Sequence, residues 1–326
     1  MEQKGYVLGG MAFLLMIPAI LMIITFADMV KTGEESVSAT LQSDSAFFAV
    51  NDIEKNAPII TTDLIRETAD NITLTGIPLT NSRLTIKSTL QEKIDDFTLD
   101  YTGQTGIDEI KCTVLKVGSS PDPFKIEINY NIYIKKGRIV HNETITQFID
   151  ISNKHIPDPM PFIKLKDFGI PKRDNNAGLI IYDSSLFDFL NSRGLENAVV
   201  YNNSTSPLFI NKCPYDPYIS HGNGDFSSII KNCLYVKYFH ESSDGACFMC
   251  KLEGKATCPH YGMETFIVPS VSHNSSQIKA PCSSDHVIFN ESTYPGTEFE
   301  YYREGNDYYN LFLDDGHRQK YGLPKY

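Results

Sequence analysis

YVLGGMAFLLMIPAILMIITFA, residues 6–27, decides how this chain is organised, because its 22 positions carry no charged side chain. As a helix the segment would be about 33 Å long, enough to cross a hydrocarbon core of ~30 Å. A cleaved secretory signal has a shorter apolar core of about 7–15 residues and a small-residue exit, for which TFA at 25–27 is an acceptable match. A buried helix of a soluble protein rarely avoids charge for so long. The length favours a retained single-pass membrane anchor, with the cleaved signal as the alternative.

The charges that flank this segment predict its orientation. Lys4 and the terminal amine precede it, whereas Asp28, Glu34 and Glu35 follow it with only Lys31 to offset them. Positive charge is retained on the cytoplasmic side. We therefore expect a cytoplasmic N-terminus in the cell membrane and residues 28–326 outside the cell.

Acceptor tripeptides for N-glycosylation occur only after residue 70. Asparagine followed by any residue and then Ser or Thr marks a surface position in a secreted glycoprotein. The candidate acceptors are Asn71, Asn142, Asn202, Asn203, Asn274 and Asn290. Their distribution agrees with an extracellular location for the bulk of the chain.

The overall charge excludes one class of partner. The net charge is −11, and no basic cluster or stripe interrupts it. Because nucleic acids are bound through concentrated positive charge, we expect no nucleic-acid partner. With 41% hydrophobic residues, the chain has enough apolar material for one large or two ordinary folded domains.

Helical periodicity continues beyond the apolar segment. Val30, Val37, Leu41 and Phe48 lie within about 20° of one another on a helical wheel. Pro58 is a helix breaker and should end the run. The pattern predicts one transmembrane and stalk helix within residues 1–57.

This N-terminus resembles the class III signal peptides of archaeal type IV pilin-like proteins, in which a short leader ending in Lys-Gly precedes a hydrophobic helix that continues into a β-rich head. The resemblance implies cleavage between Gly5 and Tyr6 and self-association through the helix. Where that family has a glutamate, this chain has Gly10. The remainder, including PDPMPFIKLKDFG at 157–169, resembles uncharacterised surface proteins of methanogenic archaea and implies no activity.

Residues 58–155 show the patterns of an α+β domain. Ile86, Leu90, Ile94, Phe97 and Tyr101 hold one face of a helix. FKIEINYNIYIKK at 124–136 alternates strictly between apolar and polar residues, and Lys136-Gly137 turns it into a second strand. We expect a helix packed on an antiparallel sheet.

The rest of the chain has a different composition. IPDPMPF at 156–162 has three prolines and is typical of an extended linker. Residues 163–326 then form a cysteine-rich lobe in which SSLFDFLNSRG at 184–194 is the clearest helix. The predicted fold is α+β, with a long N-terminal helix and an irregular C-terminal lobe.

Six of the seven cysteines lie in that lobe. Cys112 shares a strand face with apolar residues, so we expect it to be a buried free thiol. An even number of cysteines outside a cell favours disulfides, although the pairing among fifteen alternatives stays open. The disulfide candidates are Cys213, Cys233, Cys247, Cys250, Cys258 and Cys282.

A metal site is the alternative for part of this set. GACFMCKLEGKATCPH at 245–260 contains Cys247, Cys250, Cys258 and His260, which could coordinate zinc tetrahedrally. A redox-active Cys-x-x-Cys pair is less favoured, because no thioredoxin-like βαβ pattern surrounds it. We expect no obligatory cofactor, with zinc as the exception to test.

The sequence carries no recognisable catalytic motif for a serine hydrolase, a zinc protease or a P-loop enzyme. His221, His240, His273 and His286 look like ordinary surface histidines. The favoured function is structural, in adhesion, filament or envelope architecture, and not enzymatic. The alternatives are a metal-dependent enzyme using the 247–260 cluster and a carbohydrate- or partner-binding surface module.

Overall fold

A computed structural model of the chain describes residues 3–195, 198–215, 221, 233, 238–269, 280–290, 299–304 and 307–322. Within these ranges the side chains of 3–12, 15, 200, 280–281 and 299–312 are not described. The structure is a mixed α+β fold with a long N-terminal apolar helix and small sheets, as the patterning predicts.

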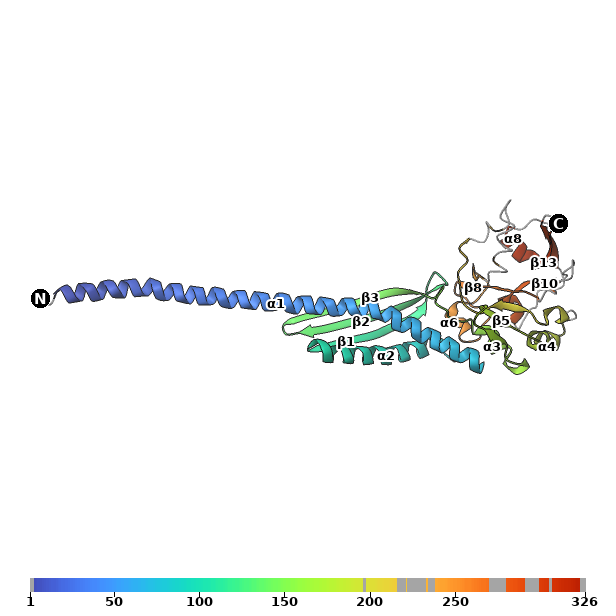
Figure 1. The fold of residues 1–326 in the computed structure, drawn as a ribbon, viewed down its shortest axis with the longest axis horizontal. Coiled ribbons are helices and arrows are strands. Elements are labelled where there is room, and N and C mark those ends of the chain that lie inside the picture. The colour runs from blue at the N-terminus through green and yellow to red at the C-terminus, as the bar shows by residue number, and fades with distance from the viewer. Residues whose placement is uncertain are drawn as a thin grey trace. The chain divides into compact units, whose positions relative to one another are not determined.

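The first half of the chain contains the longest elements (Figure 1). They are α1 (Gln3–Thr75), α2 (Ser82–Thr105), β1 (Glu109–Ser119), β2 (Lys125–Lys136) and β3 (Ile139–Asp150). The elements that follow are much shorter. They are α3 (Met160–Lys164), η1 (Lys166–Phe168), β4 (Lys172–Asp174), β5 (Leu179–Ile181), α4 (Ser185–Ser192), η2 (Ala198–Tyr201), β6 (Thr205–Pro207), β7 (His240–Ser242), α6 (Phe248–Lys251), β8 (Gly262–Glu264), β9 (Phe266–Ile267), β10 (Ala280–Pro281), β11 (Ser283–Ser284), α7 (Asp285–Phe289), β12 (Phe299–Glu304), β13 (Asp307–Asp314) and α8 (Asp315–Lys320).

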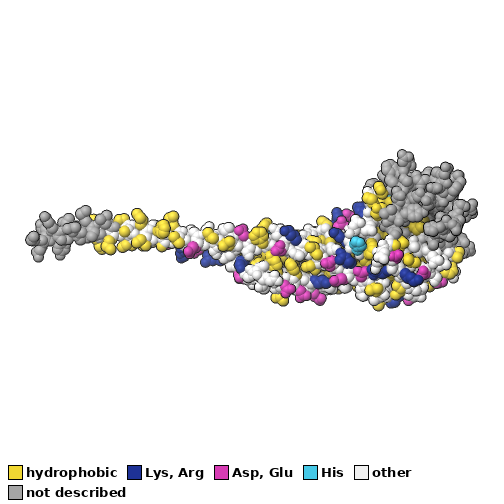
Figure 2. Space-filling view, in the orientation of Figure 1, with side chains coloured by type: hydrophobic (Ala, Val, Ile, Leu, Met, Phe, Trp, Pro, Cys, Tyr) yellow, Lys and Arg dark blue, Asp and Glu magenta, His cyan; other side chains and the backbone are white. Residues whose placement is uncertain are grey.

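The apolar part of α1 is exposed along its described length. Among the described residues, α1 is the one helix that is long and apolar enough to cross a membrane, and its most apolar stretch of 18 residues is 0% buried. Large hydrophobic side chains of this segment are exposed, and Figure 2 shows those on one face of it. They include Phe13, Leu14, Met16, Ile20, Leu21, Met22, Ile23 and Phe26.

The helix does not end at Pro58, and the prediction of a helix limited to residues 1–57 is wrong. α1 continues to Thr75. Thr61 and Thr62 donate side-chain hydrogen bonds to the carbonyl oxygens of Ala57 and Pro58, at 2.7 and 2.8 Å. An internal proline costs about 3 kcal/mol. Burial of apolar side chains, at about 1.5–3 kcal/mol each, outweighs that cost. The buried side chains on this stretch are Ile53, Leu64, Ile65 and Ile72.

The chain packs as two compact units. The first comprises Met1–Lys55, Asp95–Cys112 and Asn131–Glu143. Inside it, Tyr101 donates to Asp52 at 2.7 Å, and burial together with this carboxylate raises the pKa of Tyr101 to about 12. Gly137 has φ 57°, which suits glycine, and closes the predicted hairpin between β2 and β3.

The second unit comprises Asn56–Ile94, Thr113–Tyr130 and Thr144–Tyr326. It contains parts of all three strands of the β1-β2-β3 sheet together with the whole cysteine-rich region. The side chains of β2 alternate between buried and half-buried positions up to Ile134, as the sequence pattern predicts. The predicted boundaries between residues 58–155 and 163–326 therefore do not coincide with the units.

The predicted linker at 156–162 is part of the interior. All seven residues are buried, and α3 begins within them. Asp158 accepts a backbone hydrogen bond from Met160 at 3.1 Å, and its own amide donates to Leu208 O at 2.8 Å. The prolines lie in a buried segment in which Pro159 caps α3 and Pro161 is in its first turn, where the missing N–H of proline leaves no donor unsatisfied.

The remaining strands form small sheets of two or three strands, with orders β4-β5-β6, β7-β8, β11-β9 and β10-β13-β12. The predicted helix at 184–194 is present as α4, and Gly194 follows it with φ 78°. One apolar cluster joins these short pieces. Its largest members are Phe162, Tyr182, Tyr201, Phe289 and Phe189.

A buried ion triad lies at the centre of this region. Lys251 Nζ donates to Asp158 Oδ2 at 2.9 Å and to Asp285 Oδ2 at 2.8 Å, and each side chain is 1% exposed. Burial by itself lowers the pKa of Lys251, but the two carboxylates outweigh it and raise that pKa above its ordinary value. The ammonium therefore stays charged and joins α6, α7 and the 156–162 segment.

Replacing Lys251 with methionine tests this triad. We expect Lys251→Met to lower the free energy of unfolding by about 3–5 kcal/mol, because two buried carboxylates lose their cation. Lys255→Met is the matched control, since Lys255 is 56% exposed and its pair with Glu253 contributes less than ~1 kcal/mol. Denaturant titration followed by near-ultraviolet circular dichroism measures both. Equal midpoints for the two variants would contradict the assignment.

The continuity of α1 across Pro58 can be tested by replacing this proline. Pro58→Ala restores the missing backbone donor, so we expect it to raise the free energy of unfolding by about 1–3 kcal/mol. Ile59→Ala, at a 58% exposed neighbour, is the control and should change it by less than ~0.5 kcal/mol. A loss of stability in Pro58→Ala would indicate that the helix is interrupted here.

Candidate metal centres

None of the seven cysteines, all of which the structure describes, forms a disulfide. The sulfur atoms of Cys213 and Cys233 are 3.2 Å apart, well beyond an S–S bond of about 2.05 Å. The prediction of disulfides is therefore wrong for this structure. Of the six cysteines after residue 162, five lie in two clusters that also contain histidines, and Cys282 lies in neither cluster.

The first set contains Cys247, Cys250, Cys258 and His260, the residues of the alternative zinc prediction. One ligand atom from each lies within 4.8 Å of all the others. Cys250 Sγ is 3.6 Å from His260 Nδ1. Zinc bonds of about 2.3 Å to sulfur and 2.0–2.1 Å to nitrogen at tetrahedral angles separate such atoms by about 3.5 Å. The spacing fits a Cys₃His zinc site.

Local backbone geometry explains why these thiols converge. Cys247 precedes the first turn of α6 with extended φ and ψ of −68° and 159°, and Cys250 N donates to Cys247 O at 2.9 Å. Gly245 and Gly262 allow the adjoining strands to approach, because a Cβ at either position would lie 2.3–2.5 Å from a carbonyl oxygen. The Cys258 thiol then accepts from Cys247 N at 3.3 Å.

A cation and a hydroxyl group complete the surroundings of this set. Arg83, from the start of α2, lies 3.9 Å from Cys247 Sγ, and Ser119, from the end of β1, lies 3.2 Å from the same sulfur. Burial alone would lower the pKa of Arg83, but the nearby thiols of Cys250 and Cys247 raise it. The guanidinium would offset the negative charge of the three thiolates that a bound zinc ion requires. The centre thereby joins α2, β1 and α6 within the second unit.

The second set was not predicted from the sequence. Cys213, His221, Cys233 and His240 are all buried, and their ligand atoms also lie within 4.8 Å of one another. Cys213 Sγ is 3.2 Å from His221 Nε2. The Cys233 thiol, with smaller contributions from the two histidines, lowers the pKa of Cys213 to about 3. A thiolate with two imidazole neighbours and a second sulfur is a Cys₂His₂ zinc ligand set.

The histidines in this set correct another prediction. His221 and His240 are 0% exposed and not surface residues, and His286 is 4% exposed, while His273 lies outside the described residues. The spacing Cys-x₇-His-x₁₁-Cys-x₆-His follows no zinc-finger pattern, so only the pairing of two cysteines with two histidines in one 28-residue window could have indicated it.

The other two cysteines lie apart from these sets. Cys112 is 1% exposed and forms no disulfide, as predicted, and burial raises its pKa to about 12. Cys282 is also buried, and desolvation raises its pKa well above the ordinary value. Both therefore stay protonated and act as small apolar side chains.

The predicted modification positions have varied surroundings. Asn71 on α1, Asn142 on β3 and the pair Asn202 and Asn203 after η2 are exposed. Asn290 is half-buried, and its carbonyl oxygen accepts from Arg193. Asn274 lies outside the described residues. Gly5 and Tyr6 lie near the start of α1, and both glycosylation and leader cleavage stay predictions.

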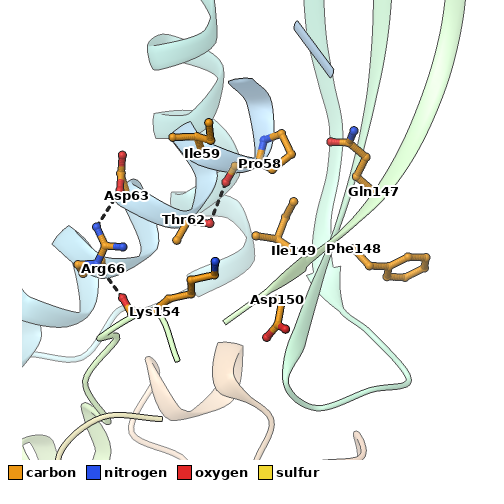
Figure 3. A pocket seen from close by; sticks show the side chains of 10 residues that line it. All are labelled: Pro58, Ile59, Thr62, Asp63, Arg66, Gln147, Phe148, Ile149, Asp150 and Lys154. Atoms are coloured by element: carbon orange, nitrogen blue, oxygen red, sulfur yellow. Dashed lines mark hydrogen bonds and ion pairs between the residues drawn. The ribbon is translucent and has the colours of Figure 1, made fainter. Parts of the chain in front are cut away.

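One open pocket of about 530 Å³ lies beside α1 and the end of β3 (Figure 3). Its polar groups bond to one another. Arg66 donates to Asp63 at 2.7 Å and to Lys154 O at 3.0 Å. The pocket is lined by two acidic and two basic side chains, of which Asp63 and Arg66 form an ion pair, and it contains no cysteine or histidine.

Replacing Cys247 tests the first centre. We expect Cys247→Ser to bind one zinc equivalent fewer per chain than the wild-type protein, measured by elemental analysis, because a three-ligand remnant binds zinc weakly. Cys282→Ser is the control and should keep the full zinc content. After chelation and denaturation without reductant, all seven thiols should react with an alkylating reagent. A single reactive thiol with unchanged zinc would restore the disulfide assignment.

Comparisons with known proteins add no name to this geometry. No protein-family model, no curated protein and no solved structure matches the chain.

Proposed function

We propose that this chain is a membrane-anchored, pilin-like surface protein with a zinc-stabilised C-terminal region, acting in adhesion, filament or envelope architecture. The observation that carries the proposal is the apolar part of α1, whose described side chains are exposed by roughly half or more. Exposing this much contiguous apolar surface to water is unfavourable. A bilayer or neighbouring copies of the same helix would cover it.

The features of the rest of α1 support the pilin-like part of the proposal. The helix runs without a break from the apolar segment into residues that pack in a folded region, where Ala46, Ala49 and Val50 begin its buried face. α2 and the β1-β2-β3 sheet then supply the helix and sheet of a pilin-like head. Self-association would run through the N-terminal helix, with leader cleavage after Gly5.

The zinc part of the proposal rests on the two Cys/His sets. Zinc has no redox chemistry and accepts tetrahedral sulfur and nitrogen ligands, so four-ligand sets of this kind are structural. The described strands and helices that carry their ligands are only three or four residues long. Such pieces gain stability from cross-links, which structural zinc provides without an oxidising environment. The orientation with a cytoplasmic N-terminus and an extracellular bulk follows from the flanking charges.

Intact-mass measurement of the protein from its native membranes tests the anchor. We expect a chain that begins at Tyr6 and stays in the membrane fraction at high salt, because the apolar helix and not surface charge holds it. A chain that begins after residue 27 would remove the anchor. A full-length chain would remove leader cleavage while keeping the anchor.

Orientation needs a separate readout in the same experiment. A membrane-impermeant amine reagent applied to intact cells should modify exposed lysines such as Lys111 and Lys172, which are 67% and 72% exposed. Cells opened by detergent give the reference extent of labelling. Labelling only after opening would place the bulk of the chain inside the cell.

The metal-dependent enzyme is the second candidate function, and one observation favours it. A third ligand set, separate from the 247–260 cluster, contains only three protein ligands. A site of that kind keeps a coordination position for a substrate or water.

A further inference from the structure

Glu264, His286 and His317 meet in the interior of the second unit, from three separate elements. Glu264 ends β8, His286 is in α7 and His317 is in α8. The three residues are 0%, 4% and 6% exposed. One ligand atom from each lies within 4.8 Å of the other two.

The facing atoms have the spacing of metal ligands. Glu264 Oε2 is 3.5 Å from His286 Nδ1 and 3.5 Å from His317 Nε2. Metal bonds of about 2.0–2.2 Å at tetrahedral angles place such atoms about 3.4 Å apart. Among the residues that the structure describes, neither ring nitrogen has a hydrogen-bond partner. Two buried nitrogens aimed at one carboxylate oxygen therefore lack a ligand that a metal ion would supply.

The outer atoms of the same side chains are already bonded. His317 Nδ1 is 2.6 Å from Asp314 Oδ2, and Asp314 also accepts from His317 N at 2.9 Å as the N-cap of α8. Tyr321 donates to Glu264 Oε1 at 2.7 Å. A carboxylate behind a histidine and a hydroxyl behind a ligating carboxylate orient metal ligands and set their tautomers. The inner nitrogen of His317 is thus left as the metal-facing one.

Lys320 is the group that a metal ion would displace. Its ammonium donates to Glu264 Oε2 and to Ser242 Oγ, each at 3.0 Å. Asp244 Oδ2 lies 3.8 Å from the same ammonium and is 59% exposed on its side chain. A divalent ion on Oε2 repels the ammonium, and Asp244 offers it a second partner nearer to solvent.

We propose that Glu264, His286 and His317 bind a third zinc ion, and that its fourth coordination position is open to water or an external ligand. No fourth His, Cys, Asp or Glu among the described residues completes this set, whereas both Cys/His sets have four members. Three-ligand histidine–carboxylate sets are typical of zinc that polarises water or a carbonyl group. The chemical class of ligand is a small anion or carbonyl oxygen that replaces the water.

The first test counts metal in the full chain, purified in detergent without a histidine tag. At saturating zinc we expect His286→Ala and His317→Ala each to bind one equivalent fewer than the wild-type protein. His141→Ala, at an exposed histidine of β3, is the control and should bind as much as the wild type. An unchanged count in both site variants would overturn the proposal.

Cobalt(II) loading separates this site from the Cys/His sets. Cobalt bound by thiolates gives sulfur-to-metal charge-transfer absorption, which histidine and carboxylate ligands do not give. We expect His286→Ala to keep that absorption and to lose only the sulfur-free signal. If the thiolate absorption were missing while the sulfur-free signal was present, the Cys/His part of the proposed function would fail and this inference would stand.

The fourth position has its own readout. Azide added to the cobalt-loaded wild-type protein should change the sulfur-free signal and leave the thiolate bands unaltered. No change at saturating azide would show a closed site and overturn the open position.

Lys320→Met keeps the test decisive if the histidine variants do not fold. It leaves all three ligands in place and removes the competing ammonium, so we expect zinc affinity at this site to rise roughly tenfold, measured by competition with a chelator. Lys255→Met, at a distant exposed lysine, is the control. An unchanged or weaker affinity in Lys320→Met would contradict metal binding at Glu264.

Discussion

The ion triad of Lys251 with Asp158 and Asp285 is the interaction on which the C-terminal region depends. A lysine at 1% exposure is stable only if its charge is matched, and here two carboxylates from distant parts of the chain match it. The triad holds the 156–162 segment in the interior, although its prolines suggest a linker. Two residues of the triad are adjacent in sequence to candidate metal ligands, since Lys251 follows Cys250 and Asp285 precedes His286. A break in the triad would therefore disturb two candidate metal centres together.

The buried ion triad stabilises this region together with its apolar side chains, and the proposed metal centres would add further cross-links. The sheets of this region have two or three short strands, and an apolar cluster of aliphatic and aromatic side chains packs among its described residues. The proposed Cys₃His centre joins α2, β1 and α6, and the proposed Cys₂His₂ and His₂Glu centres involve β7, β8, α7 and α8. The ligands of the Cys₃His set lie within 14 residues, whereas those of the Cys₂His₂ and His₂Glu sets span 28 and 54 residues. The cost of closing such long loops grows slowly with their length, so a few strong bonds suffice to hold them.

Periodic patterns predicted the regular elements well. Residues 124–136, in which apolar and polar side chains alternate, contain β2. Ile86 and Leu90, on the predicted helical face, are buried in α2, and residues 184–194 contain α4. The patterns failed where local preference and tertiary packing disagreed. Pro58 disfavours a helix locally, but the burial of neighbouring side chains keeps α1 continuous across this residue. The site was predicted in part, since Cys247, Cys250, Cys258 and His260 were identified as a zinc alternative, while the favoured disulfides do not form.

The sequence by itself determined the apolar helix, because 22 uncharged residues in a row are a local property that no folding partner can change. It also determined the strands and helices whose side chains repeat at a regular period. Only the tertiary structure decided which cysteines and histidines meet. Cys213 is joined by His240, and Glu264 by His317, across loops of 26 to 52 intervening residues. Coordination depends on distances of a few ångströms between side-chain atoms, and spacing along a chain does not specify those distances.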